Sequence, residues 1–174
     1  MSRSISHANE VVPNMNVVGN TVLERLRKED MGFVFERLVH SGEIEESEAP
    51  ILEEEFKKFI YLVSVSEKPI AMIGPKPDEV WHQFILFTRQ YEAFCEHTVG
   101  FFIDHTPDTD SARVPDDAGE EFLKAYTKHF GELPAIWTQG MAADTARAYA
   151  EWPAHGKPPV RWASVGSCAQ VRRT

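Results

Sequence analysis

Cysteine and long apolar runs are both scarce in this chain of 174 residues. Its two cysteines, Cys95 and Cys168, form no Cys-x-x-Cys pair, which excludes a disulfide framework, a zinc ribbon and a thioredoxin-like redox pair. The most apolar short segment, residues 59–65, is far below membrane-spanning length, and the N-terminal residues are polar. We therefore predict a cytoplasmic protein that has no membrane segment.

Positive charge is also in short supply. The formal net charge is −9 and the isoelectric point is about 5.2. A surface of that sign repels phosphate groups, so we expect no direct contact with nucleic acid or with an anionic membrane. Such a surface suits a protein partner, in particular a basic one. The oligomeric state is left open by the sequence.

The familiar catalytic signatures are absent as well. The sequence has no phosphate-binding glycine-rich loop, no Gly-x-Ser-x-Gly elbow, no His-Glu-x-x-His motif and no dinucleotide-binding fingerprint. It consequently predicts no particular reaction.

What the chain does contain is enough apolar surface for a core, since 43% of its residues are hydrophobic and 11% are aromatic. Its length fits one domain. We predict a flexible arm over residues 1–16, a helical domain over 17–152 and an irregular tail over 153–174.

Apolar residues recur three and four positions apart in several segments, which is the pattern of amphipathic helices. The segments are 20–42, with a kink or break at Gly32, then 47–65, 78–99, 117–130 and 141–152. The proline-rich segment 68–77 is predicted to be a connector. We predict an all-α fold of four to five helices around a central amphipathic helix, about 78–99.

Two polar residues at the start of this central helix form a candidate functional pair. Asp78 and His82 are four residues apart, so their side chains can meet on one helix face. A carboxylate that accepts a hydrogen bond from an imidazole suits both a metal ligand and a general base. In the alternative interpretation, Asp78 is a first-turn residue that stabilises the helix start and His82 is a satisfied polar group. The candidate functional cluster is completed by Arg89 and His105.

A metal site built from this segment meets a geometric objection. On an unbroken helix, His82 and Cys95 would lie roughly 20 Å apart along the axis, whereas zinc ligands lie only about 2.0–2.3 Å from the ion. The segment from Val99 to His105 reaches about 21 Å when fully extended, whereas the helix from Val99 back to His82 is about 25 Å long. His105 could therefore barely return to His82. We therefore predict no metal ligands and no cofactor, with zinc considered and not favoured.

The segment 78–107, DEVWHQFILFTRQYEAFCEHTVGFFIDHTP, resembles the core block of the glycine-rich domain-containing protein-like family. The similarity extends over roughly residues 50–131, up to His129 and Gly131 in the later helix. Phe84 stands where that family has a second histidine, and the glycine-rich segment of its larger members is absent. The resemblance implies the helical fold and no established reaction.

Three functions are compatible with the sequence. The first and preferred one is a non-catalytic protein-interaction module with an acidic surface. The second is a metal-dependent enzyme or binder centred on Asp78, His82 and His105. The third is an acidic inhibitor that blocks the basic nucleic-acid-binding surface of a partner protein, motivated by the carboxylates at 43–55 and 104–121.

Overall fold

A computed structural model describes residues 15–107, 114–155 and 167–171. Its helices and strands follow one another in this order: α1 (Met15–Lys28), α2 (Gly32–Ser41), the 3-10 turn η1 (Glu46–Glu48), α3 (Ala49–Val65), β1 (Ile70–Met72), α4 (Pro75–Ile85), α5 (Thr88–Thr98), β2 (Ile103–Pro107), α6 (Ala118–Phe130), the 3-10 turn η2 (Ala135–Trp137), α7 (Ala143–His155) and β3 (Ser167–Val171).

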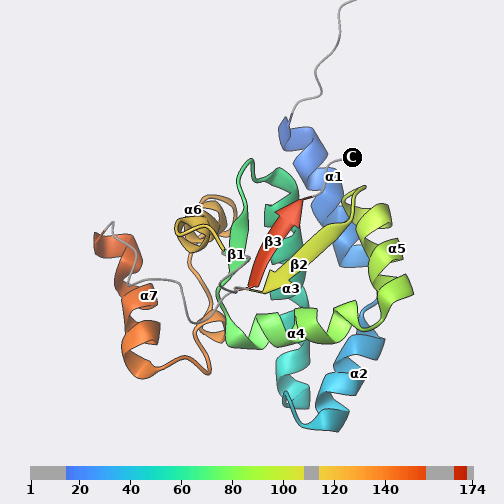
Figure 1. Ribbon diagram of the computed structural model, residues 1–174, viewed down its shortest axis with the longest axis horizontal. Helices are drawn as coiled ribbons and strands as arrows, with labels where there is room; N and C mark the ends of the chain where they lie inside the picture. The colour runs from blue at the N-terminus through green and yellow to red at the C-terminus, as the bar shows by residue number, and fades with distance from the viewer. Residues whose placement is uncertain (1–14, 108–113, 156–166, 172–174) are drawn as a thin grey trace, which may run out of the picture.

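The predicted helical class is confirmed, with one small sheet added to it (Figure 1). The described residues contain seven α-helices rather than four to five, because two of the predicted helices are each divided in two. The segment 20–42 divides before Gly32, where a break was predicted. Of the arm predicted over residues 1–16, residues 1–14 lie outside the described residues, and residues 15 and 16 already belong to α1.

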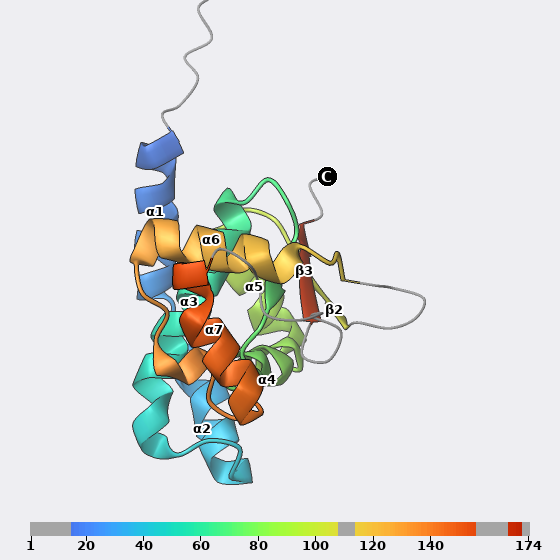
Figure 2. The ribbon, with the colours of Figure 1, turned by 90° about the vertical axis from the view of Figure 1, so that its left-hand side faces the viewer.

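The central helix of the fold is α3. It contacts α1, α4, α6 and β3, and the sheet lies in front of it in Figure 1. Its sequence explains this position, because apolar side chains three and four residues apart face the core: Leu52, Phe56, Phe59, Ile60 and Val63. Figure 2 shows the sheet at one edge of the molecule, with α1, α2 and α3 toward the opposite side.

The helix predicted over 78–99 is not continuous, and this part of the prediction is wrong. It ends at Ile85, and a new helix begins at Thr88 after a turn at Phe87, whose backbone angles are φ −87° and ψ 62°. The turn places the Phe94 ring 5.0 Å from the Phe84 ring. On a straight helix these two residues would be separated by about 15 Å of rise, so the break is what allows both rings to enter one core.

The sheet is the element that the helical periodicity did not predict. Strand order is β1-β3-β2, and the C-terminal strand pairs antiparallel with both neighbours. β1 lies inside the predicted connector and β3 inside the segment predicted to be an irregular tail. Strands of three to five residues are too short to show a clear alternation. Their pairing joins parts of the chain about a hundred residues apart for β1 and β3, and more than about sixty apart for β2 and β3.

No helix among the described residues has the length and apolar character that crossing a membrane requires.

Candidate metal site

The site begins where helix α4 begins. Gly74 precedes the helix and packs so closely on Trp137 that a Cβ atom there would lie 2.9 Å from the indole ring. The backbone N–H of Asp78 donates to the Gly74 carbonyl at 2.9 Å and closes the first helical turn. Asp78 is therefore fixed in that turn, where a carboxylate interacts favourably with the helix dipole.

His82 lies one turn further along the same face of α4. Its Nε2 is 3.7 Å from Oδ2 of Asp78. The His82 side chain is 45% exposed, so this edge of the site faces solvent. The predicted meeting of the two side chains on one helix face is thus observed.

The third residue comes from strand β2. Gly100, with φ 84°, ends α5 in a left-handed conformation that favours glycine, and its N–H donates to the Cys95 carbonyl at 3.0 Å. The chain then turns into β2, where His105 is opposite Ala169 of β3. This register brings the His105 side chain over the polar face of α4, where it is only 6% exposed.

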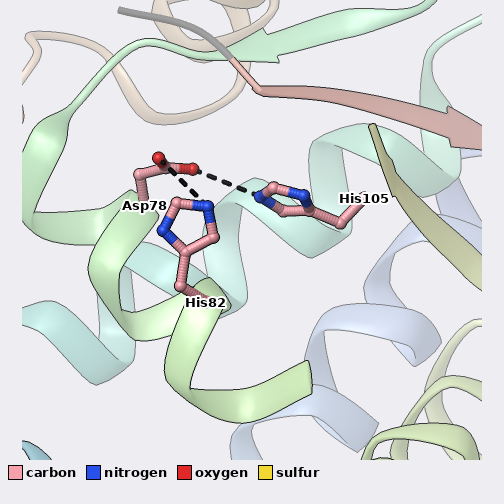
Figure 3. A group of neighbouring side chains, drawn as sticks. All are labelled: Asp78, His82 and His105. Atoms are coloured by element: carbon pink, nitrogen blue, oxygen red, sulfur yellow. Dashed lines mark ion pairs between the residues drawn. The ribbon is translucent and has the colours of Figure 1, made fainter. Parts of the chain in front are cut away.

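The carboxylate of Asp78 faces both imidazoles, which lie against one another with 4.7 Å between their ring centroids (Figure 3). One oxygen, Oδ1, is 3.6 Å from Nε2 of His105, and the other faces His82. One potential ligand atom from each of the three side chains lies within 4.8 Å of the other two. We call Asp78, His82 and His105 the triad.

His105 carries an unsatisfied polar atom into this group. Its Nε2 is buried and has no hydrogen-bond partner, because 3.6 Å to the carboxylate is too long for one. Leaving a buried polar atom unpaired costs about 1–3 kcal/mol. A buried nitrogen aimed at a carboxylate without bonding to it is the arrangement that an ion between them would satisfy.

The donor set fits a divalent transition metal. Two imidazole nitrogens and one carboxylate are ligands that Zn²⁺ and Fe²⁺ both accept in sites that keep coordination positions open. Ligands about 2.1 Å from a common tetrahedral ion lie about 3.4 Å apart, so small side-chain rotations would bring the triad to bonding distance. The net charge of −9 also favours the approach of a cation.

Two other residues considered from the sequence lie apart from the triad. Arg89 is an exposed residue of α5, and in the described part of the chain it forms no ion pair with the triad. Cys95 is fully buried in α5, and burial raises the pKa of its thiol to about 11. The metal-type grouping found among the described residues does not include Cys95.

The family model described as UCP032817-like matches residues 31–129, which is more than half of the chain and includes the whole triad. The chain belongs to the UCP032817-like family. No curated protein and no solved structure gives a significant match to it.

This membership corrects the resemblance drawn from segment 78–107. The UCP032817-like match shows that the chain is not a glycine-rich domain-containing protein-like member. A short block of tryptophan, histidine and aromatic residues was too little to assign the family.

In this UCP032817-like protein, the meeting of His82 and His105 is the point that the sequence left open. The reach calculation assumed an unbroken helix, and the break at Leu86 and Phe87 removes that assumption. No proline or glycine marks the break, so the sequence offered no local signal for it.

Proposed function

We propose that this protein is a metal-dependent binder or enzyme whose triad holds one divalent transition-metal ion. The observation that carries this proposal is the buried, unpartnered Nε2 of His105, which faces the carboxylate that His82 also faces. Three protein ligands leave at least one coordination position for water or a small ligand, as in catalytic rather than structural zinc sites.

The exposure of the three side chains supports an accessible ion. His105 is buried on the core side, whereas 45% of the His82 side chain faces solvent. An ion held between them would have protein on one side and solvent on the other. A ligand arriving from solvent could therefore take the open position.

Metal content and titration test the proposal. Protein purified without chelator is analysed for zinc, iron and manganese, then stripped with chelator and titrated with Zn²⁺ by calorimetry. We expect one equivalent of Zn²⁺ to bind and to raise the melting temperature, because a ligand that binds only the folded state stabilises it. Less than about a tenth of an equivalent in both measurements would overturn the proposal.

Variants assign the ion to the triad. His82→Ala and Asp78→Asn should each weaken Zn²⁺ binding at least about tenfold, since each removes or weakens one of three protein ligands. His97→Ala is the matched control, because His97 is an exposed histidine on α5 outside the triad. Equal affinity in all of these variants would place the ion elsewhere.

The acidic interaction module and the acidic inhibitor stay predictions from the sequence. Nothing in the described part of the chain bears on a protein partner, whereas the triad is a specific arrangement of chemically suitable groups. We therefore prefer the metal-dependent hypothesis.

A further inference from the structure

A buried chain of hydrogen bonds runs beside the triad. The indole N–H of Trp81 donates to the hydroxyl of Tyr91 at 3.0 Å, and that hydroxyl donates to the backbone carbonyl of Ile103 at 2.7 Å. All three residues are at most 2% exposed. The chain joins α4, α5 and β2, which are three separate elements.

Both ends of this series of hydrogen bonds lie close to His105. At one end, the Trp81 ring packs edge-on against the His105 imidazole, with 4.6 Å between ring centroids. At the other end, Ile103 begins β2 and lies two residues before His105. The imidazole is thereby held through its ring by one residue and through its backbone by another.

His82 and Asp78 need no such support. They belong to one helix, and their spacing alone keeps them on one face. His105 reaches the site from a strand of five residues, whose position relative to α4 is set only by tertiary contacts. If the surrounding packing were weakened, the position of His105 would therefore change before the positions of Asp78 and His82.

We infer that Trp81 and Tyr91 are positioning residues that hold His105 in place as a metal ligand. This inference rests on the proposed metal site and adds residues that would not touch the ion. Groups that orient a metal ligand typically change metal affinity by about 10–100-fold when they are altered.

Metal affinity and metal spectroscopy separate positioning from ordinary core packing. Tyr91→Phe keeps the ring and removes the hydroxyl, so the Trp81 N–H and the Ile103 carbonyl lose their common partner. We expect this variant to bind Zn²⁺ about tenfold more weakly than the wild type. We also expect the visible absorption bands of bound Co²⁺ to shift, because they report ligand geometry.

Tyr61→Phe is the matched control. Tyr61 is also a buried tyrosine whose hydroxyl has a side-chain partner, Nδ1 of His129, but it lies on α3 outside this chain of hydrogen bonds. It should lose stability without changing Zn²⁺ affinity or the Co²⁺ bands. If Tyr91→Phe does not yield folded protein, Trp81→Phe takes its place with the same expectations.

The possible outcomes distinguish the positioning role of Tyr91 from the proposed metal site on which it rests. Wild-type binding with weakened binding and shifted Co²⁺ bands in Tyr91→Phe supports both. Wild-type binding with unchanged affinity and bands in Tyr91→Phe overturns the positioning role and leaves the metal site intact. Absence of Zn²⁺ binding in the wild type overturns the proposed function, and the positioning role with it.

Discussion

At the residue scale, the most demanding group in the core is the carboxylate of Glu55. This side chain on α3 is 2% exposed and accepts hydrogen bonds from Tyr126 Oη at 2.7 Å and from Trp137 Nε1 at 2.6 Å. Lys58 completes the arrangement with an ion pair at 2.7 Å. A buried charge is tolerated only when its partners satisfy it, and here three partners do so.

Glu55→Ala should therefore destabilise the protein by about 3 kcal/mol, because it leaves Tyr126, Trp137 and Lys58 without their common acceptor. Urea unfolding measures this loss. Glu54→Ala is the matched control: Glu54 pairs with Arg27 on the surface, so its loss should cost less than about 1 kcal/mol. Similar losses in the two variants would contradict this account of Glu55.

Cys95 illustrates a buried thiol that packing makes unreactive. With a pKa of about 11, only about a thousandth of the thiol is ionised at pH 8. We expect iodoacetamide at pH 8 to leave Cys95 unmodified in the folded protein and to modify it in urea. Peptide mass spectrometry would show this, and rapid modification in the folded state would contradict it.

The same burial predicts a loss of stability in alkaline solution. Burial raises the pKa of Cys95 and of Tyr91, Tyr126 and Tyr149, so the folded state retains protons that the unfolded chain releases. The unfolding free energy should be steady below about pH 8.5. Above its own pKa in the unfolded chain, about 8.5 for cysteine and about 10 for tyrosine, each such group should lower it by about 1.4 kcal/mol per pH unit.

Urea unfolding between pH 8 and pH 11 tests this dependence. Cys95→Ala should remove the part of the decline that begins near pH 8.5, whereas the tyrosine part begins near pH 10 and should remain. An unfolding free energy that does not change with pH in the wild type would show that these groups ionise as easily in the folded protein as in the unfolded chain.

At the element scale, the division between α4 and α5 determines how the aromatic core is built. Phe84 lies near the end of α4, and its ring is 5.2 Å from the Tyr91 ring and 5.0 Å from the Phe94 ring of α5. It also contacts Phe33 of α2 and Phe56 of α3. Phe84 thus links four helices at the point where the chain changes direction.

Phe84→Ala should cost about 4 kcal/mol of unfolding free energy, because it empties a fully packed position. Leu86→Ala, two residues further on, is the matched control. Leu86 is 70% exposed, so its truncation should change stability by less than about 0.5 kcal/mol. Urea unfolding of both variants decides the matter, and comparable losses would contradict the role given to Phe84.

At the scale of the whole molecule, the C-terminal strand β3 connects the two halves of the sheet. It lies between β1 and β2, and its residue Ala169 is opposite both Ile70 and His105. The described residues contain no direct pairing between β1 and β2, so β2 depends on β3 for its place in the sheet. The site and the last strand are therefore expected to stabilise each other.

Metal binding should consequently protect β3 from hydrogen exchange. An ion at the triad would tie His105 to α4 and so oppose opening of the sheet. Those amides of Ser167–Val171 that exchange only when the sheet opens should then exchange up to about a hundredfold more slowly, when Zn²⁺ is present at a hundred times its Kd. Exchange measured by mass spectrometry with and without Zn²⁺ tests this. His105→Ala should abolish the difference, and protection that persists in this variant would contradict the linkage.

The sequence by itself determined the helical class and most helix positions. The apolar spacing of Leu52, Phe56 and Phe59 predicted α3, because a 3.6-residue period is a local property of the chain. The same spacing rule placed Asp78 and His82 on one face. The charge of the chain and the absence of a long apolar run are likewise local facts that need no fold.

Only the tertiary structure decided where the helix over 78–99 breaks and which residue joins the pair on α4. The break forms because Phe84, Tyr91 and Phe94 pack on one another, and this gain is invisible in local periodicity. His105 reaches the triad through pairing with a strand more than sixty residues later in the chain. Such long-range contacts depend on the whole packed molecule, so spacing along the chain could not reveal them.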